Sequence, residues 1–416
     1  MRVLWFTNTP SLSAGHLNNK SIGGGWIGSL EAELSKIPSI QLGVSFNFDR
    51  DIKPFNLRGT EYYPVYLPAT KSKIRSLVTR WRTPIQNESD IQPYLDIIHQ
   101  FKPDIINIFG TEGVFGLITS KTDIPCIIHL QGNLIVYDLK WHSGLTAVDV
   151  FRYSKKSDLL KGFGVFYQYR LNKKEAERER RIFHQCKFVM GRTDWDRRIT
   201  SVLSPDCKYF HCDEMIRAEF YSHKWVPKER KTNYILITTI RNNIYKGLET
   251  IFECKRILDE INAECKIVWK IAGINEADEI SYLLQRKFRA SFDENRIQLL
   301  GPLQEKELIN EMLEADVFIH PSHIDNSPNS LCEAMLLGMP VIATFAGGIP
   351  SIVENKKEGL LVQDGDPYAL AGAIMELKKN RSYANELRVN ARDKALRRHD
   401  PKRIVNDLIN IYSSII

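Results

Sequence analysis

The densest group of residues able to do chemistry lies in the segment 315–348, ADVFIHPSHIDNSPNSLCEAMLLGMPVIATFAGG. Asp325 lies in a polar loop after an apolar run, and Glu333 follows eight residues later, about one turn into a predicted helix. A carboxylate can accept two hydrogen bonds from a vicinal diol. We therefore expect Glu333 to bind a ribose and Asp325 to bind hydroxyls of a sugar. Taken singly, each carboxylate is better explained as an ordinary loop or helix charge, but together with a helix start and glycine-rich turns they indicate a site.

A helix is predicted to begin between these two carboxylates. Ser327 is expected as its N-cap, Pro328 as its first residue and Gly338 as the glycine that ends it. The first N–H groups of a helix have no partner within the helix and carry the positive end of its dipole. Phosphate groups bind at such ends. We therefore expect a diphosphate to be bound by the backbone N–H groups of Asn329, Ser330 and Leu331.

Two cations, Arg241 and Lys246, follow a predicted strand in the segment 238–250, TTIRNNIYKGLET. Cations at a strand end can hold a leaving diphosphate and compensate the charge that grows as a glycosidic bond breaks. Solvated surface charges would explain them equally well. Glycine-rich turns at residues 23–25 and at Gly347-Gly348 would let the backbone approach phosphate or sugar. Such turns occur in many unrelated proteins, so their specificity is low.

Apolar runs alternate with helical patterns along the chain. Two sets of apolar runs predict the strands of two parallel sheets. The first set lies at 2–6, 104–109, 126–130 and 188–191, and the second at 234–240, 266–272, 298–300, 317–320 and 341–344. A polar connector over residues 221–233 separates the two sets. We therefore predict an α/β protein of two Rossmann-like domains, residues 1–224 and 225–416, with the last helix, about 400–416, crossing back to the first domain. Ligands of such sheets bind outside the carboxyl ends of the strands. The site is accordingly expected in a cleft where the two sheets face each other.

The composition is that of a globular protein. The chain has 416 residues, of which 43% are hydrophobic and 26% charged, and its net charge is +7. The basic excess lies in residues 1–230, with 33 Lys and Arg against 24 Asp and Glu, which alone does not distinguish nucleic acid, anionic lipid or phosphorylated partners. The seven scattered cysteines form no CxxC pair and favour reduced thiols of a cytosolic protein. No run approaches the roughly 18 apolar residues of a membrane span.

The order of these motifs resembles that of a known family. DNSPNSLCEAMLLGMPVIAT, residues 325–344, resembles the E-x7-E segment of retaining glycosyltransferases of the GT-B fold, family 4 (glycosyl transferases group 1), including those that build bacterial capsules and the O-antigens of lipopolysaccharide. FAGGIPSIVENKKEGLLVQDGDP, residues 345–367, is similar to the usual continuation of that segment. The resemblance spans nearly the whole chain. It implies a GT-B fold and a hexosyltransferase of surface polysaccharide biosynthesis.

The resemblance also implies roles for individual residues. Glu333 would bind the nucleotide ribose, Asp325 the donor sugar, and Arg241 and Lys246 the diphosphate, and these four are the residues to which catalysis is assigned. Gly24 and Gly25 would lie near the phosphates from the other domain. The sequence departs from the family pattern at Asp325, where Glu is common, so this carboxylate reaches less far by one methylene group.

Two segments of the first half, 103–116 (PDIINIFGTEGVFG) and 127–134 (IIHLQGNL), are similar to strand ends that line the acceptor side in this family. Many relatives carry a histidine immediately before the glycine of the second segment, but here Gln131 occupies that position. Strand alternation would place His129 on the same face as Gln131, although a histidine this deep in an apolar run is more often part of the core. Glu112 follows a strand and is equally consistent with a helix N-terminal acid. The acceptor-side candidates are Glu112, His129, Gln131 and Asn133.

No pair of carboxylates is placed to flank an anomeric carbon as in a double-displacement glycosidase. The resemblance implies retention without a covalent intermediate: the acceptor hydroxyl attacks on the face from which the diphosphate leaves, and a diphosphate oxygen takes its proton. Asp364-Gly365-Asp366 matches the DxD metal signature of the other main glycosyltransferase fold, but its position in a turn favours a structural loop. We expect a UDP-sugar or GDP-sugar donor, no cofactor and no essential metal.

The basic segment KSKIRSLVTRWR begins at Lys71 and ends at Arg82. As a helix it would place four apolar residues on one face, which would suit either packing on its own domain or contact with an anionic membrane. In the second case the acceptor would be a lipid-linked saccharide. We expect a cytoplasmic protein, with peripheral contact at the inner face of the cytoplasmic membrane as the open alternative, a nucleotide-sugar donor, a saccharide or lipid-linked acceptor, and no nucleic acid partner.

Other functions remain open on the same architecture. A nucleotide-sugar 2-epimerase would bind a similar diphosphate but would need acid and base groups facing the sugar C2, for which the sequence offers no convincing set. A non-catalytic sugar-nucleotide-binding protein would retain the fold without turnover. An NAD-dependent oxidoreductase would require G-x-G-x-x-G after the first strand, and residues 23–25 do not supply this spacing.

Overall fold

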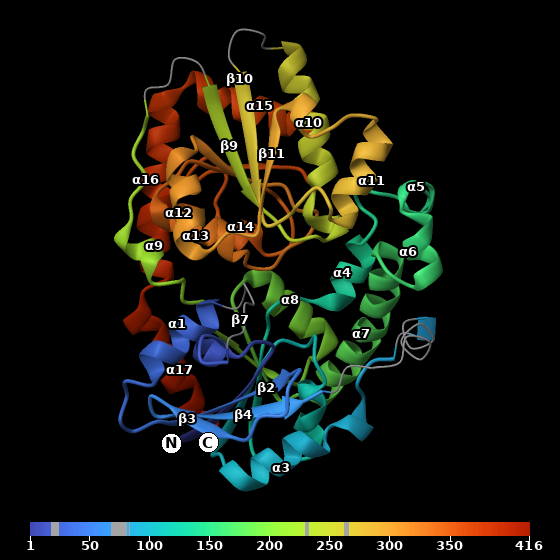
Figure 1. The fold of residues 1–416 in the computed structure, drawn as a ribbon. Helices are drawn as coiled ribbons and strands as arrows, with labels where there is room; N and C mark the ends of the chain where they lie inside the picture. Colours follow the sequence, from blue (N-terminus) through green and yellow to red (C-terminus); the bar gives the residue numbers. More distant parts are fainter. Residues whose placement is uncertain (18–24, 68–80, 83, 229–232, 262–265) are drawn as a thin grey trace. The chain divides into compact units, whose positions relative to one another are not determined.

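The computed structural model describes residues 1–17, 25–67, 81–82, 84–228, 233–261 and 266–416, which form two compact units (Figure 1). The first unit comprises Met1–Asp138, Arg170–Arg217 and His399–Ile416, and the second comprises Leu139–Tyr169 and Ala218–Arg398. This division differs from the expected one in two places. The chain enters the second unit after Arg217 instead of after residue 224, and Leu139–Tyr169 groups with the second unit instead of the first.

The first unit is built on an eight-stranded sheet with the strand order β3-β4-β2-β1-β5-β6-β7-β8. All neighbouring pairs are parallel except β3 and β4. Without the short β3, the order along the chain is that of a Rossmann sheet with one further strand, and the order reverses between β1 and β5. The strands are β1 (Arg2–Thr7), β2 (Gln41–Phe48), β3 (Phe55–Leu57), β4 (Thr60–Tyr66), β5 (Ile105–Phe109), β6 (Cys126–His129), β7 (Phe188–Gly191) and β8 (Lys208–His211).

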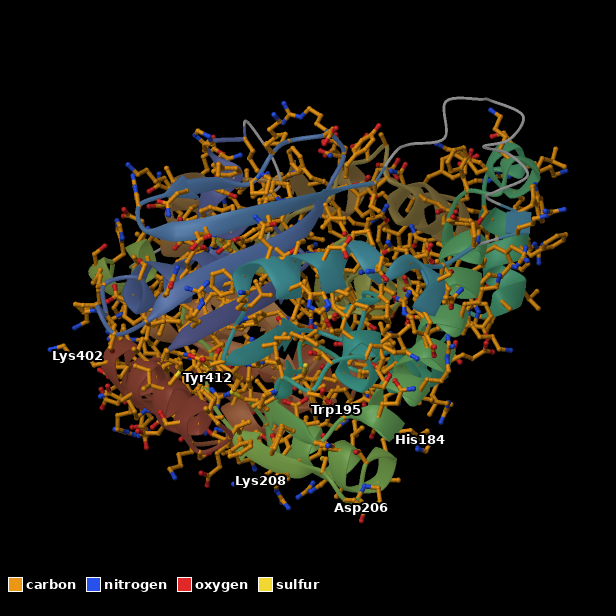
Figure 2. The ribbon with its side chains drawn as sticks, turned by 90° about the horizontal axis from the view of Figure 1, so that it is seen from below. His184, Trp195, Asp206, Lys208, Lys402 and Tyr412 are labelled. Atoms are coloured by element: carbon orange, nitrogen blue, oxygen red, sulfur yellow. The ribbon has the colours of Figure 1, made fainter. Side chains whose placement is uncertain are left out.

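Helices cover both faces of this sheet because its central strands are apolar on both sides. On β1, Val3 and Trp5 pack with α1 and α17, whereas Leu4 and Phe6 pack with α3 and α7. The indole N–H of Trp5 donates to the hydroxyl of Tyr412, 3.1 Å away, which fixes the C-terminal helix on the first sheet. Tyr412 is labelled on this helix in Figure 2. The principal helices are α1 (Gly25–Leu34), α3 (Gln92–Phe101), α4 (Leu134–Lys140), α7 (Val165–Gln185), α8 (Asp194–Leu203) and α17 (Pro401–Ser413).

The second unit contains a six-stranded, wholly parallel sheet with the order β11-β10-β9-β12-β13-β14. Numbered along this unit, the order is 3-2-1-4-5-6, the strand order of the Rossmann fold. The strand order reverses between β9 and β12. Ligands of such sheets bind at the carboxyl ends of the two strands that flank this reversal. The strands are β9 (Asn233–Thr239), β10 (Lys266–Ala272), β11 (Ile297–Gly301), β12 (Val317–His320), β13 (Val341–Thr344) and β14 (Leu360–Val362).

The helices of the second unit pack in pairs over this sheet. α10 packs on α15, and α13 packs on α16 and on strands β12 and β13. Two short helices, α5 and α6, come from the inserted segment Leu139–Tyr169, and α5 packs on α11 (Figure 1). The helices are α5 (Ala147–Tyr153), α6 (Lys156–Lys161), α9 (Glu219–Ser222), α10 (Leu248–Ile261), α11 (Glu279–Phe288), α12 (Glu305–Glu314), α13 (Asn329–Leu337), α14 (Ile349–Ile352), α15 (Pro367–Lys379) and α16 (Arg381–Arg398).

Side-chain contacts explain why the inserted segment groups with the second unit. The ammonium group of Lys287 lies 3.1 Å from the carboxylate of Asp149 on α5. Gly164, with φ of +89°, leaves no room for a side chain because a Cβ there would lie 2.1 Å from a carboxylate oxygen of Glu279. The predicted fold class is thus confirmed as α/β with two Rossmann-like parallel sheets.

Candidate functional site

The loops that follow β9 and β12 meet at the point where the strand order of the second sheet reverses. Lys246 ends the loop after β9, and Asp325 lies in the loop after β12. The ammonium group of Lys246 lies 2.6 Å from the Asp325 carboxylate, and Nε2 of His320 lies 3.1 Å from the same oxygen. The structure therefore brings together two of the four residues to which the sequence assigns catalysis, and it adds a histidine.

The protonation of Asp325 and His320 depends on their neighbours at this edge. Burial raises the pKa of Asp325, but the opposite charge of Lys246 and the hydrogen bond from His320 outweigh it and hold this pKa below its usual value. Burial lowers the pKa of His320 in spite of the neighbouring carboxylate. At neutral pH the arrangement is therefore a carboxylate held between an ammonium group and a neutral imidazole. A polar ligand can exchange into this set of hydrogen bonds without creating an isolated buried charge.

Glycines let the three loops at this edge pack closely. Gly247 has φ of +76°, and a Cβ there would lie 2.1 Å from the carbonyl oxygen of Pro321. Gly347 has φ of +55°, and a Cβ there would lie 1.9 Å from the carbonyl oxygen of Asp325. The N–H of Gly348 donates to the same carbonyl, 2.9 Å away. Gly347 and Gly348 were predicted to approach phosphate or sugar, and in this structure both approach the backbone of the Asp325 loop.

Helix α13 begins one residue later than predicted. Pro328 is its N-cap, with an extended ψ of 113° and no side-chain capping bond, so Ser327 is not the cap. The N–H groups of Leu331 and Cys332 both donate to the carbonyl of Pro328, which removes Leu331 from the predicted set of three free donors. The N–H groups of Asn329 and Ser330 precede these first helical bonds. Gly338 ends the helix with φ of +80°, as predicted.

The other two residues predicted to be catalytic lie in different surroundings. Glu333 is buried one turn inside α13, with 4% of its surface exposed. Arg241 is exposed at the start of the loop after β9. The N–H of Asn243 donates to the carbonyl of Arg241 at 2.7 Å, so this loop turns sharply before it reaches Lys246.

A second polar group near this edge was not predicted. Nε2 of His323 lies 2.6 Å from a carboxylate oxygen of Glu249, and Nδ1 lies 3.4 Å from the carboxylate of Asp364. Burial lowers the pKa of His323, but the two carboxylates outweigh it and raise this pKa above its usual value. The pKa of Glu249 is lowered, because the hydrogen bond and charge of His323 outweigh the effect of burial. His323 is two residues from Asp325 and therefore anchors the same loop.

Both acids of the Asp364-Gly365-Asp366 turn have partners within the protein. Asp364 accepts from His323 and lies 3.7 Å from the ammonium group of Lys140. Asp366 is the N-cap of α15 and accepts from the N–H groups of Tyr368 and Ala369 at 3.0 and 2.9 Å. These contacts give the turn a structural role.

In the first unit, the predicted acceptor-side residues lie around the carboxyl ends of β1, β5 and β6. The amide of Asn8, just after β1, donates to the Glu112 carboxylate at 3.3 Å. Glu112 folds over Gly110, where a Cβ would lie 1.9 Å from its carboxylate and 3.1 Å from Cγ of Gln131. Burial raises the pKa of Glu112 in spite of the bond from Asn8. Asn8, which the sequence did not single out, therefore joins two predicted residues where the order of this sheet reverses.

Two neighbouring acids on α7 support these loops. Glu179 accepts from the hydroxyl of Thr111 and from the N–H of Ile135, the latter at 2.8 Å. Burial raises the pKa of Glu179 to about 7 and that of Glu175 also to about 7. Arg178, between them on the helix, donates to the backbone carbonyl of Glu112. The helix thus holds the loop after β5 through groups that sequence periodicity does not reveal.

His129 belongs to the core. Only 1% of its surface is exposed, and its ring lies 5.2 Å from that of Phe109 and 5.3 Å from that of Trp26. Burial, followed by the charge of Arg192, lowers the pKa of His129 to about 3, so the ring is neutral. Strand β6 ends at His129, so the alternation expected between His129 and Gln131 does not apply.

Asn133 is also buried, with its amide oxygen accepting from the N–H of Val136 at 3.0 Å at the start of α4. Gly25 is the first residue of α1, and a Cβ there would lie 2.7 Å from the side chain of Arg217, which accounts for this glycine by packing. Gly24 lies outside the described residues, as does the basic segment from Lys71 apart from Trp81 and Arg82.

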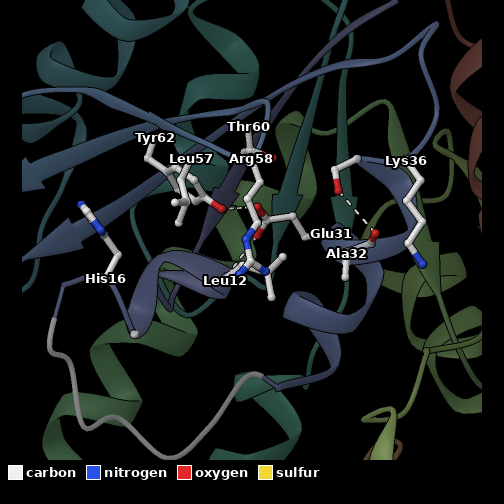
Figure 3. Close-up of a pocket in the computed structure, with 11 residues that line it drawn as sticks. Leu12, His16, Glu31, Ala32, Lys36, Leu57, Arg58, Thr60 and Tyr62 are labelled. Carbon is white, nitrogen blue, oxygen red and sulfur yellow. Dashed lines mark hydrogen bonds between the residues drawn. The ribbon is translucent and has the colours of Figure 1, made fainter.

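A pocket of about 560 Å³ lies elsewhere in the first unit, against α1 and the β3–β4 hairpin (Figure 3). Glu31 lies at its base and accepts from the Tyr62 hydroxyl and from the N–H of Leu12, the latter at 3.2 Å. Arg58 extends over it from the hairpin (Figure 3). None of the predicted site residues is among the described residues that line this pocket.

The two Rossmann-like sheets and their strand orders define a GT-B fold. Sucrose-phosphate synthase from Thermosynechococcus elongatus has this fold, with a TM-score of 0.72 at 14% identity over 100% of this chain and 98% of that one. HepE from Anabaena, solved in complex with UDP-glucose, has a TM-score of 0.62 at 17% identity over the full length of both chains. Residues 220–394, which hold Lys246, Asp325 and Glu333, match the model of the family Glycosyl transferases group 1.

Curated relatives of this chain are named as glycosyltransferases. The putative colanic acid biosynthesis glycosyltransferase WcaL of Salmonella typhimurium is 27% identical over 187 residues, which is 43% of this chain and 45% of the relative. The 2-deoxystreptamine N-acetyl-D-glucosaminyltransferase of Niallia circulans is 27% identical over 131 residues, or 32% of this chain and 34% of the relative. The matched stretch therefore spans less than half the length of either relative. Among the described residues, no helix has both the length and the apolar character needed to cross a membrane.

Proposed function

We propose that this protein transfers a sugar from a nucleotide-diphosphate sugar to a saccharide or lipid-linked saccharide in surface polysaccharide biosynthesis. The observation that carries the proposal is the pairing of Lys246 with Asp325 at the edge where β9 and β12 end. This edge is where Rossmann sheets bind nucleotides. The family match over 220–394 and the likeness to WcaL support transfer as the reaction and polysaccharide as its product.

In this proposal, the diphosphate of the donor binds at the N-terminus of α13 and takes Lys246 as a counter-ion. The N–H groups of Asn329 and Ser330 donate to it, and Lys246 offsets the charge that develops on the leaving oxygen. Glu333, buried one turn inside α13, accepts from the ribose hydroxyls. Asp325 accepts from hydroxyls of the donor sugar, and Arg241 closes over the diphosphate from the solvent side.

The proposed reaction retains the anomeric configuration and requires no metal ion. The acceptor hydroxyl attacks the anomeric carbon on the face from which the diphosphate departs. Its proton passes to a diphosphate oxygen, so the donor C–O bond breaks as the new one forms and no protein base is needed. Lys246 and Arg241 supply the positive charge that a metal supplies in other transferases. UDP-sugars and GDP-sugars are the proposed donors, and the cytoplasmic side of the membrane is the proposed place of the reaction.

A thermal-shift panel of UDP-glucose, GDP-mannose, ADP-glucose and dTDP-glucose tests the donor site. One nucleotide class should raise the melting temperature of the wild type, because a ligand that binds only the folded state stabilises it. Glu333→Ala should abolish this rise. Glu358→Ala is a matched control, since Glu358 is also buried (5% exposed) and bonds within its own loop to the N–H of Glu354 at 2.7 Å. It should keep the ligand-dependent rise even if its own melting temperature falls.

Product analysis then separates transfer from the alternatives. Release of nucleoside diphosphate that depends on a saccharide acceptor, with the anomeric configuration of the product read by NMR, would support a retaining transferase. Activity lost with a chelator and restored by manganese would contradict the metal-free mechanism. Conversion of the donor sugar to its C2 epimer without acceptor would replace transfer by epimerisation. No thermal shift with any nucleotide sugar would contradict the donor site itself.

A further inference from the structure

The segment Leu139–Tyr169 carries an unusual amount of exposed apolar surface. Six of the eighteen large hydrophobic side chains that are exposed among the described residues lie in this one segment, with exposed fractions between 45% and 77%. They are Leu139, Val148, Phe151, Leu160, Phe163 and Phe166. Single exposed apolar residues need no explanation, but a group of this size marks a surface that binds something. Val148 and Phe151 lie on α5 and Leu160 lies on α6, and we call these three residues the apolar surface of α5 and α6; the other three flank these helices along the chain.

The two helices that carry most of this segment are short, with seven residues in α5 and six in α6. α5 packs on α11 (Figure 1) and buries Val150, whereas its Val148 and Phe151 are 72% and 76% exposed. α6 has no buried residue, and Gly162 ends it in the left-handed conformation. Leu160, on α6, is 75% exposed, and Phe163, just after the helix, is 45% exposed. None of the six apolar residues belongs to the buried core among the described residues.

The same segment is basic. It contains Lys140, Arg152, Lys155, Lys156 and Lys161 against two acids, Asp149 and Asp158. Of the acids, Asp149 already faces Lys287 at 3.1 Å. Arg152, Lys156 and Lys161 are exposed in the helices that carry Phe151 and Leu160. Exposed aromatic and leucine side chains interleaved with cations are the combination that binds an anionic lipid surface, because the rings enter the interface while the cations stay at the headgroups.

We propose that the apolar surface of α5 and α6 docks the protein on an anionic membrane. This proposal does not depend on the donor site, and it places membrane contact in a part of the chain different from the basic segment that begins at Lys71. A second copy of the chain is a poorer occupant, because a two-fold symmetric contact would bring the exposed cations Arg152, Lys156 and Lys161 of both copies close together. Nucleic acid would use the cations but would leave the phenylalanine and leucine side chains in water.

Co-sedimentation with vesicles tests the proposal on the full chain. Vesicles of phosphatidylcholine with 30% phosphatidylglycerol should bind the wild type, and vesicles of phosphatidylcholine alone should bind it more weakly. Phe151→Glu with Leu160→Glu should lower the partition coefficient on the anionic vesicles by about tenfold or more, because both apolar anchors become charges that anionic lipid repels. Lys156→Ala with Lys161→Ala should weaken binding to the anionic vesicles and leave binding to neutral vesicles unchanged.

The matched control replaces exposed apolar residues elsewhere by the same charge. Val202 and Tyr368 are 78% and 73% exposed, and Val202→Glu with Tyr368→Glu should bind vesicles as the wild type does. All variants should keep the melting temperature of the wild type, since none of the replaced side chains is buried. Equal binding by the Phe151/Leu160 variant and the wild type would overturn the proposal. So would a wild-type dimer in light scattering that the same variant dissociates, because a second copy would then occupy the surface. Donor-induced thermal shifts remain in the Phe151/Leu160 variant if only the docking surface is affected.

Discussion

The ammonium group of Lys246 lies 2.6 Å from the carboxylate of Asp325, and the two residues come from loops 79 positions apart in the sequence. Both side chains are mostly buried, with 15% and 13% of their surface exposed. Each charge therefore depends on the other in the free protein. In the proposed donor complex, the same cation would bind the diphosphate and the same carboxylate the donor sugar.

Replacing Lys246 by methionine should separate the catalytic contribution of this pair from its structural one. Lys246→Met should lower kcat/KM by about 10²–10³, the usual loss when a group that stabilises developing charge is removed. It should also reduce the free energy of unfolding by about 3 kcal/mol, because the Asp325 carboxylate loses its cation. The double variant Lys246→Met with Asp325→Asn should recover most of the stability and none of the activity. Recovery of both by the double variant would show that the pair is only structural.

Gly347→Ala should displace the loop that carries Asp325. A Cβ at this position would lie 1.9 Å from the carbonyl oxygen of Asp325, and φ is +55°. The left-handed conformation costs about 1–2 kcal/mol for alanine, and the clash adds a similar amount. Denaturant unfolding should show a loss of about 2–4 kcal/mol, and the donor-induced thermal shift should disappear.

Gly365→Ala is the control for backbone strain alone. Gly365 has φ of +72°, but its nearest neighbour to a new Cβ is Cε1 of His323 at 3.3 Å. This variant should lose about 1–2 kcal/mol and keep the donor-induced shift. If both glycine variants kept the shift equally well, close approach of the Gly347 turn would not be required for the site.

His323→Gln should make the stability of the protein less dependent on pH. The imidazole faces Glu249 at 2.6 Å and Asp364 at 3.4 Å, with Lys140 beyond Asp364 and the hydroxyl of Thr250 on Glu249. Its pKa is raised in the folded protein. The charged ring therefore contributes its full stabilisation below the unfolded pKa of about 6.5 and loses it as the pH rises through the folded pKa.

Urea unfolding at pH 6 and pH 9 measures this contribution. At pH 6 the wild type should unfold at a higher midpoint urea concentration than His323→Gln. This difference between the two midpoints should be smaller at pH 9. His184→Gln, at an exposed position on α7, should match the wild type at both values. A difference that grows with pH would mean that His323 is neutral between its two carboxylates.

Sequence patterns located α13 and the strands around it well because these elements are local. The glycine that ends α13, the two carboxylates eight residues apart and the strands before them all lie in one continuous stretch. The start of α13 was wrong by one residue because Pro328 adopts an extended ψ of 113°, so its carbonyl accepts the first helical bonds. In that sequence context a proline fits both the N-cap and the first helical position, and only the backbone angles distinguish these two positions.

Contacts between distant residues could not be predicted from the sequence. His323 and Glu249 are 74 positions apart, and each lies in a segment whose local pattern is satisfied without the other. The grouping of Leu139–Tyr169 with the second unit rests on contacts such as Lys287 with Asp149, 138 positions apart. Strands β2 and β4 were missed because polar residues interrupt them, as in QLGVSFNF and TEYYPVY, and their assignment depends on pairing with neighbours.

Glu112 should control the acceptor without affecting the donor. Its carboxyl group is held by Asn8 at 3.3 Å where the first sheet reverses its order, and burial raises its pKa. In the protonated form it can donate one hydrogen bond and accept others, which suits a neutral sugar hydroxyl better than a phosphate. Neutral methyl hexopyranosides can supply that hydroxyl, with released nucleoside diphosphate as the readout.

Glu112→Ala should raise the acceptor KM about tenfold, the loss expected for one or two hydrogen bonds, and leave the donor-induced thermal shift unchanged. Glu112→Gln should keep a KM near that of the wild type, because the amide also donates and accepts. The acceptor KM of the wild type should rise as the pH passes the raised pKa and the carboxyl group loses its proton, whereas that of Glu112→Gln should stay constant. Glu177→Ala, at an exposed position on α7, should behave as the wild type. An acceptor KM that falls with rising pH would instead assign the ionised carboxylate to acceptor binding.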